Sequence, residues 1–169
     1  VNYKTVMSDA ASGFTSVTYP FPVIRMADLY LMYAEALNEK GEDYATVLPW
    51  IDMVRERSGL QGVKESWDQY VGNSKYATQT GLRQIIMQER RIELAFEGHY
   101  FWDVRRWKTA TTELTQPLTG WKVRYGETDV DYYSENLVLV RDFTPKMYFW
   151  PIDIGELRKD PNLVQNYGW

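Results

Sequence analysis

The stretch ERRIELAFEGHYFWDVRRW, residues 89–107, decides the fold of this chain, because it sets four carboxylates and four arginines among large apolar side chains. At 3.6 residues per turn, its apolar residues share one side of a helix, with Glu89 and Glu93 close to that side. Gly98 is expected to end this helix, and an aromatic-rich segment follows it. Because an unpaired buried charge is very costly, we expect these carboxylates and arginines to pair.

The carboxylates of this stretch are predicted to be structural rather than catalytic. A glycosidase needs two carboxylates about 5–10 Å apart on either side of a sugar. Residues 89, 93 and 97 instead follow an i, i+4 spacing along one helix, with arginines nearby. We expect an ion-pair network that joins the helix of residues 80–97 to a shorter helix at 100–108. Its predicted members are Glu89, Arg90, Glu93, Glu97, Asp103 and Arg106.

The composition indicates one folded domain, residues 1–169, since apolar residues make up 44% of a chain long enough to bury a core. A net charge of −4 argues against nucleic acid as a partner. The sequence contains no run of about 18 apolar residues, so it predicts no membrane-spanning helix. Cysteine is absent, which excludes disulfides and thiolate metal sites, and His99 is the single histidine. Neither a cofactor nor a metal site is expected.

Periodic apolar residues predict a helical hairpin, with helices at about 24–39 and 44–57 and a turn at Gly41. Pro49 is tolerated only near a first turn, so the second helix is expected to be well formed from Val47. The hairpin is loosely similar to one tetratricopeptide unit, which cannot close a core without neighbouring repeats.

The other segments are predicted to be less regular. Residues 1–24 favour an extended lead-in, and residues 60–79 a polar irregular segment. Residues 109–148 are loop-rich, with strand-like runs at 120–125 and 136–140. A short helix is expected at 153–158, followed by a tail that docks on the protein.

Three blocks of sequence occur in a fixed order. The first is VIRMADLYLMYAEALNEKG (23–41) with WIDMVRERSGL (50–60), the second is IIMQERRIELAFEGHYFWDVRRW (85–107), and the third is FWPIDIGELRKDPNLVQNYGW (149–169). Together they resemble the C-terminal part of the SusD/RagB family of outer-membrane nutrient-binding lipoproteins from Bacteroidetes. The chain departs from the family pattern at Tyr100, usually arginine, at Asp160, usually asparagine, and at Tyr167, usually proline.

The resemblance implies a mainly α fold, in which long loops on tetratricopeptide-like helical hairpins build the ligand site. It also implies a non-enzymatic protein that binds glycans or other nutrients and caps a SusC-like, TonB-dependent transporter. Family members are anchored at the cell surface by an N-terminal lipidated cysteine. Because a complete member is much longer, we expect this chain to be the C-terminal portion of one.

Aromatic residues in the loops are the candidate glycan contacts, because the apolar C–H faces of sugars stack on Trp and Tyr rings. The main glycan site of the family draws largely on upstream segments, so no binding residue is carried over by motif, and packing is the alternative role of each ring. The candidates are Trp67, Tyr70, Tyr76, Trp121, Tyr125, Tyr132 and Tyr133. The tryptophans expected in the core are Trp50, Trp102, Trp107 and Trp150.

Two other functions stay open from the sequence. The chain could be a purely structural scaffold that contacts the transporter and makes no ligand contacts. A tetratricopeptide-like peptide adaptor would require a basic or amphipathic groove, which the sequence does not show. Asp129, Asp131 and Glu135 form an oxygen-rich cluster, but the glycine of a calcium-binding loop is absent.

Overall fold

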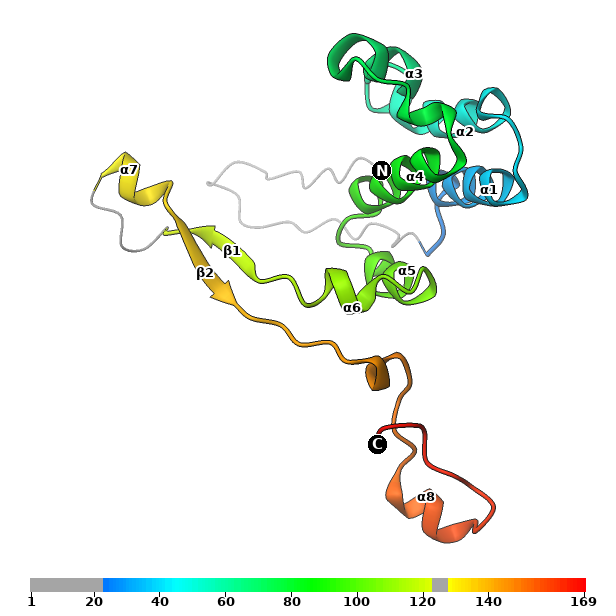
Figure 1. Cartoon of the computed structure of the whole chain (residues 1–169), viewed down its shortest axis with the longest axis vertical. Coiled ribbons are helices and arrows are strands. Elements are labelled where there is room, and N and C mark those ends of the chain that lie inside the picture. The colour runs from blue at the N-terminus through cyan, green and yellow to red at the C-terminus, as the bar shows by residue number, and fades with distance from the viewer. Residues whose placement is uncertain (1–22, 123–127) are drawn as a thin grey trace, which may run out of the picture. The chain divides into compact units, whose positions relative to one another are not determined.

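A computed structural model of the chain describes residues 23–122 and 128–169 and is mainly helical, as predicted (Figure 1). Backbone contacts divide the chain into two compact units, Val1–Leu94 and Ala95–Trp169. A single family domain over the whole chain stays a prediction. Within the described ranges, no helix combines the length and apolar character needed to cross a membrane.

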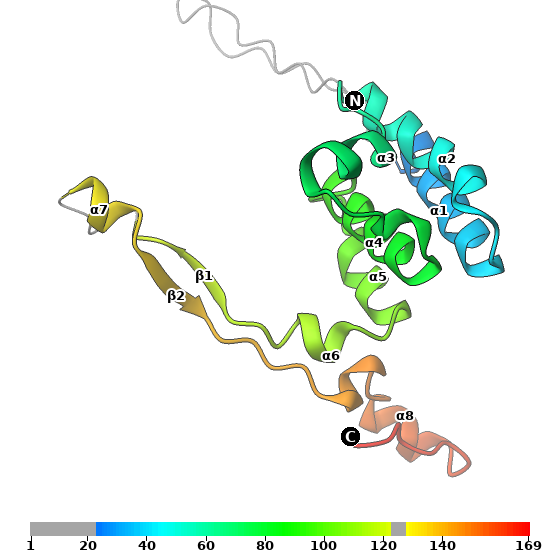
Figure 2. The same ribbon diagram turned by 45° about the horizontal axis from the view of Figure 1, so that its top comes forward.

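The predicted hairpin is confirmed by α1 (Met26–Lys40) and α2 (Tyr44–Arg57), which lie side by side in both views (Figures 1 and 2). Gly41 ends α1 in the left-handed conformation, with φ of 87°. The later start predicted for α2 is wrong, because α2 begins at Tyr44 and contains Pro49. Pro49 is exposed and removes only its own backbone donor, while Val47 and Leu48 beside it are buried.

The core of the first unit forms where α4 (Gln79–Glu93) packs against this hairpin. The Thr78 hydroxyl caps α4 by accepting from the Gly81 N–H at 3.1 Å. The largest fully buried apolar side chains of this core come from α1, α2, α3 and α4, and they are Leu31, Val47, Ile51, Val63, Leu82 and Ile86.

The predicted extension of this helix to residue 97 is wrong. The helix ends at Glu93, and the chain then turns through two left-handed residues, Phe96 (φ 64°) and Gly98 (φ 82°), which cannot continue a right-handed helix. Phe96 is fully exposed and Ile92 is largely so, although both were expected on the apolar side.

The segment between α2 and α4 is more regular than predicted. It contains α3 (Val63–Ser66), the π-helical turn η1 (Trp67–Val71) and the 3-10 turn η2 (Lys75–Ala77). Tyr76 is buried rather than exposed, because its ring packs edge-on against Tyr44 with centroids 5.5 Å apart. Its hydroxyl donates to Asp68 Oδ1 at 2.8 Å, which gives the buried phenol a partner.

The second unit has a smaller core of Val104, Ala110 and Phe143, which packs α5 (His99–Arg106) and α6 (Ala110–Glu113) against the chain near η3 (Pro145–Tyr148). The run predicted at 136–140 forms β2 (Glu135–Leu139), which pairs antiparallel with β1 (Leu118–Trp121), and β1 overlaps the run predicted at 120–125 only in its last two residues. The short helix α7 (Asp129–Tyr132) lies between the strands in sequence. Residues 123–127, which include part of the first predicted run, lie outside the described residues.

The tail carries α8 (Ile154–Lys159) close to the predicted position, with Asp153 as its cap. The Trp169 indole N–H donates to the carbonyls of Lys146 and Phe149, both at 3.1 Å, which docks the last residue as expected. The core assignment of Trp102 and Trp150 is wrong, since both are more than half exposed. Trp50 is partly buried against the first core, and Trp107 is half-buried.

Candidate functional site

The charged residues of α4 pair with arginines and an aspartate of α1, α2 and the residues next to them. Glu93 accepts from Arg25 at 2.7 Å and from Arg57 at 2.8 Å. Arg25 also donates to the backbone carbonyl of Glu93 at 2.9 Å. The side chains of Arg25 and Glu93 are almost buried, so this pair fixes the end of α4 against the start of α1.

Two further pairs join α4 to the same hairpin. Arg90 donates to Asp28 at 2.8 Å, and both side chains are buried. Arg55 pairs with Glu89, and its remaining donors reach the carbonyl of Gln61 at 2.8 Å and the hydroxyl of Ser66 at 3.0 Å. The arginines of α2 therefore link α4 and the segment that follows α2.

One ion pair of Asp103 lies within α5, where Arg106 donates to it at 2.9 Å across three residues. Glu97 lies in the turn after α4. A network that joins the helix of 80–97 to the helix of 100–108 stays a prediction. The two arginines that donate to Glu93 occupy its carboxylate, which agrees with a structural role.

Three of the predicted glycan contacts gather in the second unit, around the end of the β-hairpin. The Trp121 and Tyr133 rings lie 5.3 Å apart at 80°, and the Tyr132 and Tyr133 rings lie 4.9 Å apart at 79°. Trp121 is 59% exposed and Tyr133 is 61% exposed. We call these three residues the hairpin aromatic cluster.

The fold brings the hairpin aromatic cluster together through backbone pairing. Trp121, at the end of β1, lies opposite Glu135, at the start of β2. The Lys122 N–H donates to the Tyr132 carbonyl at 3.2 Å, which holds α7 beside the strand. The Thr128 hydroxyl caps α7 through the Asp131 N–H at 3.2 Å. The exposed rings thus sit on a hydrogen-bonded frame with polar side chains around them.

The other four candidates are not brought into this cluster. Tyr70 is exposed on η1, whereas Trp67 packs partly against the first core with Lys75 Nζ 5.4 Å from its ring centroid. Tyr76 is buried, which is incompatible with sugar stacking in this conformation. Tyr125 lies outside the described residues.

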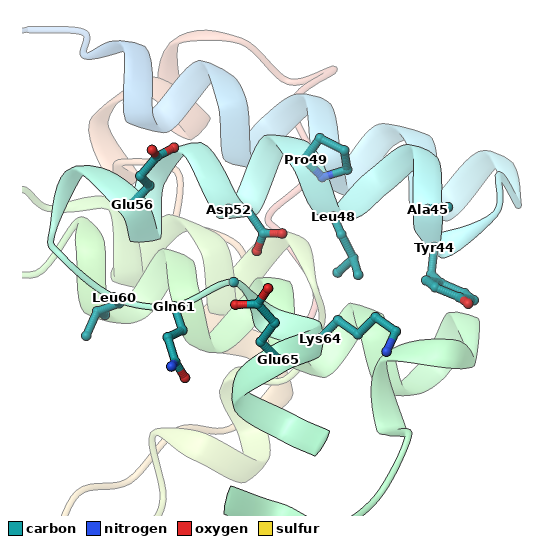
Figure 3. A pocket seen from close by; sticks show the side chains of 11 residues that line it. Tyr44, Ala45, Leu48, Pro49, Asp52, Glu56, Leu60, Gln61, Lys64 and Glu65 are labelled. Atoms are coloured by element: carbon teal, nitrogen blue, oxygen red, sulfur yellow. The ribbon is translucent and has the colours of Figure 1, made fainter. Parts of the chain in front are cut away.

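A pocket of about 580 Å³, which sequence reasoning missed, lies between α2 and residues 60–65 (Figure 3). Asp52 and Glu65 point toward the same space in Figure 3, and Glu56 lines its rim. Burial, more than any neighbouring charge, raises the pKa of Asp52, although its Oδ1 accepts from the Val63 N–H at 2.7 Å. The pocket depends on the chain folding back after α2, which no local periodicity indicates.

Metal-binding geometry is not found among the described residues, where no three carboxylate or imidazole groups converge on one point. Asp131 accepts from the Thr128 hydroxyl at 2.7 Å, so this carboxylate is used within its own turn.

Two of the departures from the family pattern also have local partners. The Tyr100 hydroxyl donates to Glu113 at 2.9 Å, and Asp160 accepts from the Asn162 N–H at 2.9 Å.

The fold and these exposed rings define a helical-hairpin protein that carries aromatic residues on an appended β-hairpin. The model of the SusD family matches residues 1–169, so the chain belongs to the SusD family. The family prediction made from the three sequence blocks is confirmed.

Relatives of known sequence agree with this membership. SusD-like protein P25 of Formosa agariphila is 39% identical over 144 residues, which are 85% of this chain and 23% of that protein. SusD-like protein P2 of the same organism is 37% identical over 98 residues, 57% of this chain and 18% of that protein. The chain therefore spans only about a fifth of the length of these curated relatives.

Solved structures show the same fold. A SusD-like carbohydrate binding protein from Bacteroides fragilis has a TM-score of 0.67 and 32% identity, with 85% of this chain and 28% of that chain covered. A second SusD-like protein from Bacteroides fragilis has a TM-score of 0.69 and 28% identity, with 91% and 28% covered. The mainly helical fold with SusD-like neighbours was the fold class expected from the sequence.

Proposed function

We propose that this chain is the C-terminal portion of a non-catalytic, glycan-binding protein and that the hairpin aromatic cluster contributes to glycan contact. Membership in the SusD family gives the class, and one solved relative is described as a carbohydrate binding protein. The observation that carries the proposal for this chain is the exposure of Trp121 and Tyr133 beside one another.

The chemistry of the cluster suits a sugar ring. Two exposed rings at 80° present one flat face and one edge, so a pyranose can stack on the first and lie against the second. Lys122 and Ser134 follow Trp121 and Tyr133 in the sequence and can supply polar groups to the hydroxyls of the ligand. Stacking of this kind is tolerant of sugar type, so the glycan itself is not defined by the cluster.

The test is calorimetric titration of the longer protein that carries this chain, with neutral oligosaccharides of several linkages. Loss of an aromatic contact of about 0.5–1.5 kcal/mol weakens binding roughly two- to tenfold. We expect that weakening for both Trp121→Ala and Tyr133→Ala. Tyr167→Ala is the control, because Tyr167 is an exposed tyrosine, 87% against 61% for Tyr133, that has no ring contact in the described structure.

Two results would contradict the proposal. Unchanged affinity in both cluster variants would favour the alternative that this chain is a scaffold without ligand contacts. Release of shorter sugars during the titration, followed by chromatography, would show that the protein is an enzyme.

The partner and the location form the second part of the proposal. We infer that the longer protein is lipid-anchored at the outer-membrane surface and works with a SusC-like, TonB-dependent transporter, as the family resemblance implies. Co-purification of the transporter with the tagged longer protein from detergent-solubilised membranes tests this. Recovery of the tagged protein alone, in the soluble fraction, would contradict it.

A further inference from the structure

A second aromatic cavity, separate from the hairpin aromatic cluster, lies within the second unit. Its volume is about 170 Å³, and it is lined by Phe101, Arg105, Phe143, Met147, Phe149, Trp150 and Trp169. We call it the Arg105 pocket. Trp150 is 66% exposed, and Phe149 and Trp169 are also exposed, so the pocket opens to solvent between aromatic rings. Pockets for drug-sized ligands measure about 300–1,000 Å³, so this one admits a single small ring or group.

Arg105 is the charged residue of this pocket, and aromatic rings surround its guanidinium. The guanidinium carbon lies 4.2 Å from the Phe101 ring centroid, 5.2 Å from that of Phe143 and 5.8 Å from that of Trp150. These cation–π contacts hold the guanidinium plane in place. No carboxylate of the described residues forms an ion pair with it.

The donors of Arg105 are only partly used. Nη1 donates to the Met147 carbonyl at 2.6 Å, and this is the hydrogen bond that Arg105 makes within the described ranges. Nε is buried and has no hydrogen-bond partner there. Nε and Nη2 lie on the same edge of the guanidinium, which is the edge that binds a carboxylate side-on. The pocket therefore contains a positioned cation whose Nε–Nη2 edge has no hydrogen-bond partner among the described residues, and Nε is covered by protein atoms until a ligand moves them aside.

A second positive charge lies at the border of the pocket. Lys146 Nζ lies 4.4 Å from the ring centroid of Trp169, whose indole N–H in turn docks on the Lys146 carbonyl. Two cations beside exposed aromatic rings favour a ligand that combines a negative charge with an apolar face.

We propose that the Arg105 pocket binds the carboxylate-bearing ring of an acidic sugar, a uronic acid. The carboxylate pairs with the free edge of Arg105, and the C–H face of the sugar stacks on Trp150. A neutral sugar would leave the guanidinium edge unfilled, so the pocket selects charged over neutral rings. This site does not depend on the hairpin aromatic cluster, because the two sets of residues do not overlap.

The test is calorimetric titration of the longer protein that carries this chain with oligogalacturonate and with its methyl-esterified, uncharged form. We expect the charged form to bind at least about tenfold more tightly, and its affinity to fall as salt is raised. Trp150→Ala and Arg105→Lys should each weaken binding of the charged form about tenfold, since Lys keeps the charge but not the two-donor edge. Titration with acetate tests the carboxylate alone and should give much weaker binding.

Controls separate this proposal from the previous one. Tyr167→Ala should leave oligogalacturonate binding unchanged, while circular dichroism checks that Arg105→Lys is folded. Trp150 is exposed, so Trp150→Ala keeps the test valid even where Arg105→Lys does not fold. Equal affinity for the charged and esterified forms, no binding of either, or full affinity in Trp150→Ala would each overturn the proposal. Loss of neutral-glycan binding in Trp121→Ala bears only on the hairpin aromatic cluster.

Discussion

At the scale of single residues, the ion pairs of α4 differ in burial and therefore in energetic weight. Arg90 and Asp28 have side chains only 3% and 9% exposed, whereas Arg83 and Glu39 on the same pair of helices are 38% and 44% exposed. Breaking a buried pair leaves an uncompensated charge, while an exposed pair is screened by water. The two pairs thus allow a matched comparison.

We expect Arg90→Ala to lower the free energy of unfolding by about 3–5 kcal/mol, because Asp28 would stay buried without its arginine. Arg83→Ala is the control on the same helix and should cost at most about 1 kcal/mol. Urea denaturation of the chain measures both. Similar losses in the two variants would show that burial does not set the strength of these pairs.

The raised pKa of Asp52 gives a pH dependence with a defined sign. Burial raises its folded pKa above the value of 3.8 that is usual for an aspartate, so the folded state binds this proton more tightly than the unfolded state. Its contribution to stability is therefore largest at low pH and falls as pH rises from about 4 through the raised pKa. Asp52→Asn keeps an oxygen that can accept from the Val63 N–H.

We expect Asp52→Asn to be more stable than the parent chain at pH 7, with the difference shrinking as pH falls toward 4. Urea denaturation at a series of pH values measures this difference. A variant whose advantage grew at low pH would contradict the assigned direction of the pKa shift.

At the scale of elements, the first turn of α4 packs closely against the backbone of η2 at Gly81. A Cβ at this position would lie 2.1 Å from the carbonyl oxygen of Lys75 in η2. Helix propensity alone predicts that Gly→Ala stabilises a helix by roughly 1 kcal/mol. The steric conflict is with backbone, which cannot move without shifting η2 or α4.

We therefore expect Gly81→Ala to destabilise the chain by about 1–3 kcal/mol, opposite in sign to the propensity effect. Thr80→Ala, at the neighbouring exposed position, should change stability by at most about 0.5 kcal/mol. Thermal unfolding followed by circular dichroism measures both changes. A higher midpoint for Gly81→Ala would show that the approach of η2 is not tight in solution.

Elements with a local cause were predictable from the sequence. The hairpin follows from periodic apolar residues and from Gly41, and the cap of α8 follows from Asp153. The bounds of α2 agree with the predicted helix of 44–57, whereas the later well-formed start expected from Pro49 is wrong, because the burial of Val47 and Leu48 outweighs the cost of the proline. The end of α4 was missed because Phe96 and Gly98 make one turn together.

Sites formed by distant segments were not predictable in the same way. The i, i+4 spacing placed Glu89 and Glu93 on one helix, but Arg25 is 68 residues from Glu93 in the chain, and no spacing rule connects them. Trp121 and Tyr133 were individually named as exposed rings, yet their contact depends on the register of β1 and β2. The burial of Tyr76 was not predictable from spacing, because it depends on packing against Tyr44 and on Asp68 as a partner for the hydroxyl.

At the scale of the whole molecule, the two units bury very different amounts of apolar side chain. The core of the first unit draws on α1, α2, α3, η2 and α4. The core of the second unit is built around Val104, Ala110 and Phe143, and β1 and β2 contribute no buried residue to it. The free energy of local opening rises with the density of buried contacts. The backbone amides of the two units should therefore differ in their protection from hydrogen exchange.

Hydrogen exchange followed by mass spectrometry tests this difference on the intact chain. We expect amides of α1, α2 and α4 to exchange at least about a hundredfold more slowly than those of β1, β2 and α8, since roughly 1.4 kcal/mol of opening free energy corresponds to each factor of ten. Arg90→Ala should speed exchange throughout α1, α2 and α4, because the buried pair with Asp28 links this core. It should leave the exchange of β1 and β2 unchanged. Equal protection of the strands and α4 would contradict the unequal cores, and faster exchange of both units in Arg90→Ala would show that the chain opens as one cooperative whole.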